Sequence, residues 1–457
     1  MATVTREHIG DLHEKITVKL TKEDYWPSFE KSLKQYAKQA NVPGFRKGMV
    51  PAGMVRKMYG QSLFGDEVLR SAGKQLEDYL QNEKLAIFAQ PMIIPNEEKI
   101  NLDMNNPSEV DFSFEVGLKP DFEIPALKNN TSLTKYKVTV GDKMLEDEIE
   151  RISRRYGKVE DQETISTKDD LVYTTYEVSD ADGNIAAESQ KVEDTELFEK
   201  FPAKLQDLLR GKKAGDSLVI RPSEIAEGEE LATFMKGLKL GTESADQHFK
   251  LTITKVGLLI PRALDAELFL EVFPNEMITS EEAFRERIRT ELSKEYDRIS
   301  KERLQNEIYE LLVHNTPLQL PVNFLKRWMQ EGQDKPKSAS EVEKEFPGFD
   351  HQLRWTLISD KLIQDNNINV SLAEVTEDIK GRVLSYFGMD NDEDAPWMDS
   401  YMQKVAKDQK TMDETYRRIL FDRLFQWLET QFNVEEKEVT EEEFFKLPDP
   451  HAAHHHH

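Results

Sequence analysis

An apolar stripe at helical spacing over residues 279–313 constrains this chain more than any other feature of its sequence. The run Thr279-Ser280-Glu281-Glu282 is a capping sequence for a helix start. Apolar residues follow it at mostly helical spacing, with wider gaps on either side of Ile299. They are Phe284, Ile288, Leu292, Ile299, Leu304, Ile308, Leu311 and Leu312. Shorter stripes follow at Leu320-Pro321, around Trp355 and around Tyr416. The sequence therefore predicts an almost wholly helical region over 261–448, interrupted at 331–345 and 390–394.

Composition favours an elongated, helix-rich molecule of about three domains. The chain has 457 residues, of which 32% are charged and 38% hydrophobic, whereas a compact sphere usually holds more apolar residues. Because there is no cysteine, a thiol nucleophile, disulfides and cysteine-ligated metal are excluded. No apolar run approaches the roughly 18 residues of a membrane span, and the N-terminus lacks a signal peptide's apolar core. We expect a soluble, cytoplasmic protein, with a purification-tag remnant at 451–457.

The first 117 residues have the pattern of an α+β domain. Residues 1–20 alternate as a strand does, with Leu12, Ile16, Val18 and Leu20 on one face. Helical spacing follows from Tyr25 to Ala40, and we expect two further helices, from about Ala52 and over 64–83. Strand-like segments at 86–94 and 109–117 close the domain.

The segment 42–51 lies in the one strongly basic region of an acidic protein. The formal net charge is -25, yet residues 31–65 hold seven Lys or Arg and no Asp or Glu. Two glycines and two prolines in the segment forbid a helix and specify an exposed loop. Phe45 at its tip, flanked by Arg46 and Lys47, suits a negatively charged surface with an apolar crevice. Composition alone favours the simpler alternative, a solvated basic loop with Phe45 folded inward.

This segment resembles the ribosome-docking signature of trigger factor, G-F-R-x-G-K-x-P. Gly44, Phe45, Arg46, Gly48 and Pro51 match it, and Met49 replaces the usual lysine. The resemblance implies docking on the large ribosomal subunit near the exit tunnel, with Arg46 and Lys47 on rRNA phosphate and Phe45 on protein. The expected ribosome-binding residues are Gly44, Phe45, Arg46, Lys47, Gly48 and Pro51. Since Met49 removes one phosphate contact, we expect somewhat weaker docking than the family pattern implies.

Residues 160–258 resemble an FKBP-type peptidyl-prolyl isomerase domain. Gly211, Lys213, Ala214, Gly215 and Asp216 preserve the family's turn between a short helix and a strand. The resemblance implies an apolar aromatic pocket, but Lys204 and Leu205 stand where the family has Gly and an aromatic residue. A charged ammonium at the rim of a dry site disfavours catalysis. We therefore expect a binding or structural module, assign no catalytic residue, and leave isomerase activity uncertain.

Taken over the whole chain, the resemblance implies an α+β multidomain fold. Its expected parts are an N-terminal α+β docking domain (1–117), a linker with a helix (118–159), a degenerate FKBP-like β domain (160–258), an elongated all-helical C-terminal chaperone domain with arms (259–448) and a tail (449–457). The implied function is an ATP-independent, ribosome-associated chaperone for nascent or unfolded polypeptides. We expect no cofactor and no metal, because no P-loop or zinc spacing is present. Homodimers of the free molecule are also implied.

Weak, reversible binding of unfolded chains requires shallow apolar patches on a charged surface. The aromatic residues and methionines of the helical region supply the candidates: Trp328, Met329, Phe346, Phe349, Tyr386, Phe387, Trp397, Met398, Tyr401, Phe444 and Phe445. The alternative is that most of these belong to the helical core. Two other functions stay open, an active FKBP-type isomerase with an unrecognised pocket and a free acidic holdase that rarely visits the ribosome.

Overall fold

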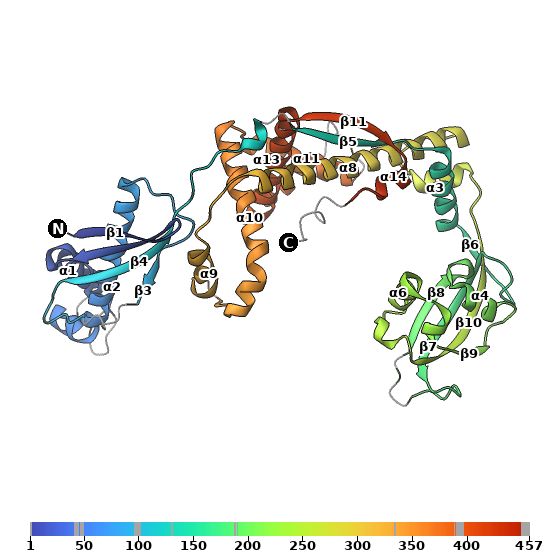
Figure 1. Cartoon of the computed structure of the whole chain (residues 1–457), viewed down its shortest axis with the longest axis horizontal. Helices are drawn as coiled ribbons and strands as arrows, with labels where there is room; N and C mark the ends of the chain where they lie inside the picture. Colours follow the sequence, from blue (N-terminus) through green and yellow to red (C-terminus); the bar gives the residue numbers. More distant parts are fainter. Residues whose placement is uncertain are drawn as a thin grey trace. The chain divides into compact units, whose positions relative to one another are not determined.

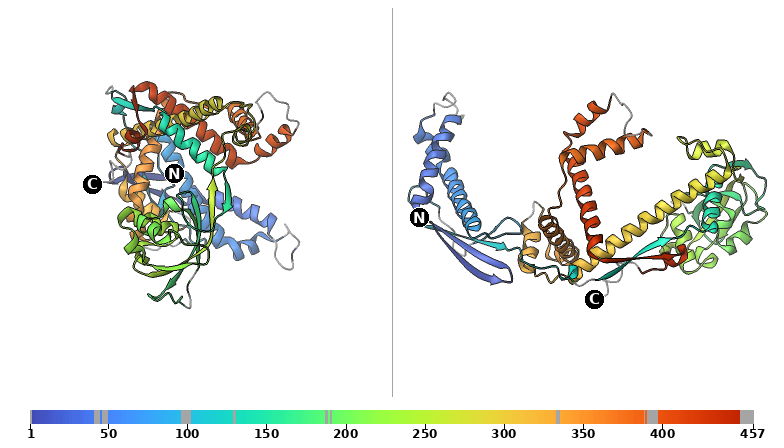
Figure 2. Two further views of the ribbon diagram at one scale, coloured as in Figure 1. Left: turned by 90° about the vertical axis from the view of Figure 1, so that its right-hand side faces the viewer. Right: turned by 90° about the horizontal axis from the view of Figure 1, so that it is seen from above.

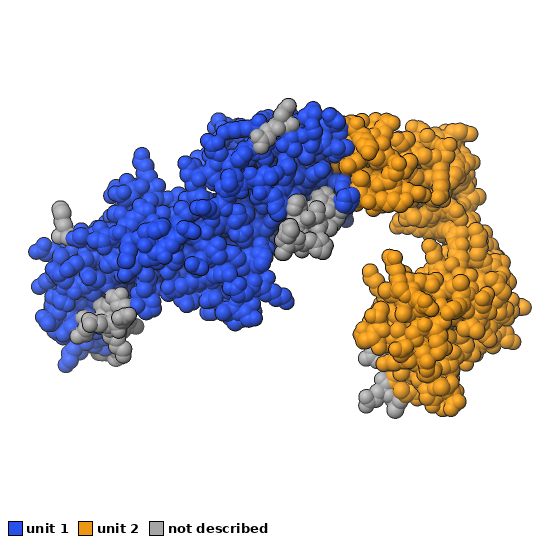
Figure 3. Space-filling view, in the orientation of Figure 1, with its two compact units in different colours: residues 1–134, 303–435, 448–457 blue, residues 135–302, 436–447 orange. Residues whose placement is uncertain are grey.

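The protein is described by a computed structural model over residues 2–40, 45, 50–95, 102–128, 131–186, 189, 191–332, 335–387, 389 and 397–448. Its contacts divide into two compact units (Figure 3). Unit 1 joins Met1–Thr134 with Arg303–Glu435 and Pro448–His457, and unit 2 joins Lys135–Glu302 with Glu436–Leu447. The mixed, multidomain fold expected from the sequence is confirmed, with an N-terminal sheet and helix pair, a β-rich middle and a helical last third (Figure 1).

The N-terminal part of unit 1 is an antiparallel sheet in the order β1-β2-β4-β3. Its strands are β1 (Thr3–Gly10), β2 (His13–Leu20), β3 (Met92–Ile94) and β4 (Val110–Gly117). Ile16 lies opposite Phe114 and Val18 opposite Phe112. Because side chains alternate along a strand, these apolar residues share the face that meets the helices. The single strand predicted for residues 1–20 is wrong: the chain reverses after Gly10, and Leu12 takes a positive φ of 50°.

Two helices, α1 (Lys22–Gln39) and α2 (Ala52–Asn82), cover that face and extend beyond the sheet (Figure 2). A capping box between Thr21 and Asp24 starts α1. The structure has one helix where the sequence predicted two, at about Ala52 and at 64–83. Gly60 and Gly65 do not interrupt α2, since Val55, Phe64 and Val68 continue one buried face through them. At Gly60 a Cβ would stand 2.5 Å from Met104 Sδ, so glycine permits close packing there.

The helical part of unit 1 surrounds a core that includes Phe324, Leu325, Ile358 and Leu424. Its helices are the last third of α8 (Glu281–Asn315), α9 (Val322–Glu331), α10 (Ala339–Asp365), α11 (Leu372–Tyr386), α12 (Met398–Val405) and α13 (Gln409–Gln431). The uninterrupted helix expected over 279–313 is confirmed by α8. The last third is not wholly helical, because β11 (Asn433–Val439) pairs with β5 (Ser132–Val138).

Unit 2 is built on a second antiparallel sheet, ordered β6-β10-β7-β8, with β9 also paired to β10. Its strands are β6 (Lys158–Asp161), β7 (Asp170–Ser179), β8 (Val192–Leu197), β9 (Ser217–Ile220) and β10 (His248–Ile260). Its helices are α3 (Asp142–Arg155), α4 (Ala203–Leu209), α5 (Pro222–Ile225), α6 (Gly228–Gly237), α7 (Ala266–Val272), α14 (Glu441–Phe445) and the first two thirds of α8. Short 3-10 turns lie in unit 1 at Pro125–Leu127, and in unit 2 at Phe198–Lys200 and Thr242–Ser244.

Candidate functional site

The connection between α1 and α2 presents Phe45 at the surface, with 37% of the residue exposed. The inward-folded alternative for Phe45 therefore does not hold in this structure. Pro51 is exposed and is the N-cap residue of α2. The other expected docking residues, Gly44, Arg46, Lys47 and Gly48, lie outside the described residues. A small core of Ala40, Val50 and Val55, separate from the main core, closes the two helix ends beneath Phe45.

Around this tip the surface is both basic and apolar. Five exposed cations lie on the two helix ends, and none of them forms an ion pair with another described residue: Lys31, Lys34, Lys38, Arg56 and Lys57. Arg56 lies 5.7 Å from the ring centre of Trp26 instead. Three apolar side chains of the predicted helical stripes are also exposed: Tyr36, Met54 and Met58. This tip (Tyr36, Phe45, Met54, Met58 and the five cations) offers positive charge beside apolar surface.

A second candidate site is an apolar groove formed by α11, α12 and the start of α13. Four of the expected residues line it, in consecutive edge-to-face contacts: Tyr386, Phe387, Trp397 and Tyr401. Phe387 and Trp397 have ring centres 5.2 Å apart at 71°. The groove holds about 500 Å³. Tyr386 is 85% exposed and Phe387 61% exposed, so aromatic surface faces water there. Such exposed apolar surface is typical of a binding site.

A polar side chain of the groove is fixed from its own helix and from α13. Arg382 also lines the groove; its Nε lies 2.9 Å from Asp378 of α11, and its Nη2 donates to Thr415 Oγ1 of α13 at 2.8 Å. The sequence reading missed Arg382 and three further lining residues: Ile379, Val383 and Thr411. The spacing Ile379, Val383, Tyr386 places these residues on one face of α11, and that signal was present in the sequence.

The remaining expected residues do not form a second groove. Met329, Phe346, Met398 and Phe444 are buried in cores, at 3%, 8%, 3% and 5% exposure. Trp328 and Phe349 are partly buried, with ring centres 6.3 Å apart. Phe445 is 65% exposed, but it lies in unit 2. For Trp328, Met329, Phe346 and Phe349, helix–helix packing explains the correction, because α9 and the first half of α10 turn these four side chains toward each other and toward the core.

In the middle segment Leu205, which stands where the family has an aromatic residue, belongs to a hydrophobic core. Leu205 is fully buried, and Phe201, Phe249 and Leu238 pack in the same core. Tyr176 is also fully buried, and its ring centre lies 6.3 Å from that of Phe234 on α6. Burial raises the pKa of Tyr176 although the Thr174 hydroxyl lowers it. Lys204 Nζ donates to the Glu224 carbonyl at 2.9 Å, so its ammonium joins α4 to the end of α5.

The turn that carried the FKBP resemblance has the expected geometry. Gly211 and Gly215 have positive φ angles of 78° and 92°, which favour glycine. The Lys213 N–H donates to Asp216 Oδ2 at 3.0 Å and closes the turn. The segment 185–189 is described except for residues 187 and 188, and Ala186 N–H donates to the Val178 carbonyl.

Among the described residues no group of three or more His, Asp or Glu side chains is placed to hold a metal ion. Within the same described part, no helix is long and apolar enough to cross a membrane.

Three protein-family models match the chain in order. They are described as "Bacterial trigger factor protein" at residues 2–152, "Probable trigger factor, FKBP-like domain" at 159–261 and "Probable trigger factor, C-terminal domain" at 300–447. Together they leave few residues of the chain unmatched.

Relatives of the same kind align over most of their length. A trigger factor from Salinibacter ruber is 23% identical, covering 96% of this chain and 94% of its own. One from Chlorobaculum tepidum is 26% identical, covering 82% and 84%. A solved structure described as concerning promiscuous substrate recognition by the trigger factor chaperone aligns with a TM-score of 0.44 and 19% identity, over 93% of this chain and 98% of that one.

Proposed function

Because the chain belongs to the trigger factor family of chaperones, we propose that it docks on the ribosome and binds nascent or unfolded polypeptides without ATP. The observation that carries the binding proposal is the aromatic groove of α11 and α12, where four rings lie at the surface around about 500 Å³. A groove of this size takes a short apolar stretch of an extended chain. Its affinity is modest, so a client can leave without an energy source.

The docking part of the proposal rests on the tip between α1 and α2. Exposed Phe45 supplies an apolar anchor, and the five exposed cations of α1 and α2, which form no ion pair among the described residues, supply charge for phosphate. Outside residues 31–65 the chain holds 54 Lys or Arg and 86 Asp or Glu, a net charge of -32, which repels nucleic acid. Contact with RNA is therefore confined to the tip, and this separates a ribosome-docking chaperone from a free acidic holdase.

Client binding is tested by removing two rings from the groove. We expect Phe387→Ala with Trp397→Ala to weaken binding of an unfolded apolar polypeptide roughly tenfold or more, about 1.4 kcal/mol, because central aromatic anchors carry most of an apolar contact. The measurement is fluorescence anisotropy of a labelled, permanently unfolded client.

The matched control removes two exposed apolar side chains outside the groove, Leu270→Ala with Met277→Ala, which are 59% and 99% exposed. It should bind the client as the parent does. Equal weakening in both double variants would mean that general surface hydrophobicity, and not the groove, binds clients.

We further propose that the FKBP-like segment does not isomerise prolyl bonds. Catalysis needs an open apolar pocket that takes the prolyl ring, whereas Leu205 and its neighbours fill this core and Lys204 bridges α4 to α5. In a proline-containing peptide assay we expect rates within about twofold of the uncatalysed reaction, whose barrier is about 18–20 kcal/mol. Acceleration of about a hundredfold or more would establish the rival function, an active isomerase.

A further inference from the structure

Helix α9 packs directly against the open end of the N-terminal sheet, within unit 1. Phe324 of α9 is fully buried, and its ring centre lies 5.6 Å from that of His13 on β2, edge to face. Gly117 at the end of β4 permits this approach, because a Cβ there would stand 2.3 Å from Phe324 Cδ1. The contact joins Phe324 to residues that are 207 and 311 positions earlier in the chain.

Beside Phe324 the same contact contains an ion pair whose carboxylate is buried. The Glu115 side chain on β4 is only 4% exposed, and Arg327 Nη1 of α9 lies 2.7 Å from its Oε1. His13 Nε2 lies 3.1 Å from Oε2 of the same carboxylate. A carboxylate so buried needs a charged partner. The sheet provides a histidine for it, and α9 provides a permanent cation.

Apolar side chains near β3, the strand next to β4, form a further contact between the two parts. Phe88, Ala89 and Met92, which lie just before and on β3, pack against the core that contains Phe324, Leu325 and Met329. The N-terminal part and the helical part of unit 1 are thus held together by α9 through apolar and ionic contacts.

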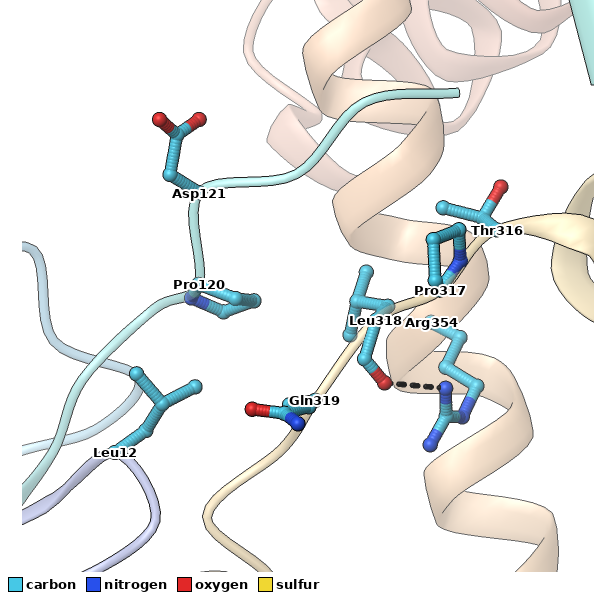
Figure 4. A pocket seen from close by; sticks show the side chains of 8 residues that line it. All are labelled: Leu12, Pro120, Asp121, Thr316, Pro317, Leu318, Gln319 and Arg354. Carbon is cyan, nitrogen blue, oxygen red and sulfur yellow. Dashed lines mark hydrogen bonds between the residues drawn. The ribbon is translucent and has the colours of Figure 1, made fainter. Parts of the chain in front are cut away.

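The segment by which the chain leaves the N-terminal part runs side by side with the segment that joins α8 to α9, and an open cavity lies beside both connectors (Figure 4). Residues 118–125 lead away from β4 and include Pro120 and Pro125, and residues 316–321 lead into α9 and include Pro317 and Pro321. The cavity holds about 470 Å³ and is lined from both connectors, with Leu12 of the β1–β2 turn at its edge. Arg354 of α10 fixes one connector by donating to the Leu318 carbonyl at 2.7 Å.

We propose that α9 is a latch that holds the N-terminal domain against the helical body. Residues 118–125, which lead from β4 out of the N-terminal part, are the hinge, and the cavity beside them gives the hinge room to turn. The Glu115–Arg327 ion pair sets the balance between the closed arrangement, in which α9 lies against the sheet, and an open one, in which α9 has left it. In the intact chain the closed arrangement dominates, so the docking tip and the groove-bearing helices belong to one rigid unit. This latch does not depend on client or ribosome binding.

The test measures the distance between the two parts of unit 1 in the full chain. Because the protein has no cysteine, spin labels on Lys74→Cys and Gln364→Cys, both exposed, report one pair of positions. We expect one narrow distance distribution for the parent. Arg327→Ala leaves Glu115 without its cation and should raise the open fraction by about tenfold or more as a second, longer population. Gly117→Ala, which displaces Phe324, should do the same.

Lys326→Ala is the matched control, because Lys326 adjoins Arg327 on α9 but pairs with Glu343 of α10 at 2.7 Å. It should keep the parent distribution. Protection of the β2 and β4 amides against hydrogen exchange shows whether each variant keeps its sheet. If Gly117→Ala loses this protection, its distance distribution is not used, and Arg327→Ala alone tests the latch. A broad distribution in the parent, or an Arg327→Ala distribution equal to that of the parent, would overturn the latch.

Discussion

In the docking that we propose for the tip between α1 and α2, Phe45 and its two basic neighbours bind by different forces, which differ in their dependence on salt. Burial of the Phe45 ring would contribute roughly 1.5–3 kcal/mol and depend little on ionic strength. The phosphate contacts proposed for Arg46 and Lys47 would instead weaken with salt, each changing the slope of log affinity against log salt by about 0.7–0.9. Sequence alone identified these residue types, but only the structure places Phe45 at the surface.

We therefore expect Phe45→Ala to lower ribosome affinity about ten- to hundredfold at every salt concentration, without changing the salt slope. Arg46→Ala with Lys47→Ala should reduce that slope by about 1.5. Titrations of labelled protein with ribosomes at several salt concentrations measure both effects. If Phe45→Ala alters the slope as much as the double variant does, the assignment of forces is wrong.

Among the elements, α11 has a pH-sensitive anchor. Its first turn carries Glu374. The Glu374 carboxylate accepts a hydrogen bond from the backbone N–H of the N-cap residue Ser371 and forms an ion pair with Arg423 of α13. The hydrogen bond from Arg423, followed by those from Ser371, lowers the pKa of Glu374 from 4.5 to about 2. A lowered carboxyl pKa contributes stability above the unfolded value, and this is lost as the pH falls from about 4.5 to about 2.

We expect the protection factors of the α11 amides against hydrogen exchange to fall over this pH window. In Glu374→Gln, protection should be lower at neutral pH and change less on acidification. The rest of unit 1 gives an internal reference in the same experiment. Parallel pH profiles for the parent and Glu374→Gln would show that another group controls α11.

Individual helices show which features could be predicted from the sequence and which could not. Periodicity located α8 almost to the residue, because a long stripe with a capping start has no competing interpretation. It divided α2 wrongly, because the packing of Met104 on Gly60 is a tertiary contact that the local pattern does not show. It named four groove residues together with four buried ones, since an aromatic at helical spacing fits a core and a surface equally well. The contact of Phe324 with Gly117 is long-range and left no local signal.

At the scale of the whole molecule, the acidic surface and the basic tip have opposite effects on contact with RNA. A net charge of -25 keeps most of the surface away from RNA and from acidic neighbours, and the seven cations over 31–65 make the tip the exception. The groove and the tip both lie in unit 1, whereas the FKBP-like sheet lies in unit 2. The residues that we propose for client binding and for docking thus belong to one unit.

The most direct test of the central claim is co-sedimentation with ribosomes of the triple variant Phe45→Ala, Arg46→Ala and Lys47→Ala. Its control, Phe445→Ala with Lys437→Ala and Lys446→Ala, removes an exposed ring and two exposed cations elsewhere. We predict that the parent and the control pellet with ribosomes, and that the triple variant stays in the supernatant while remaining folded. A triple variant that pellets like the parent, or a parent that does not pellet, would contradict the account.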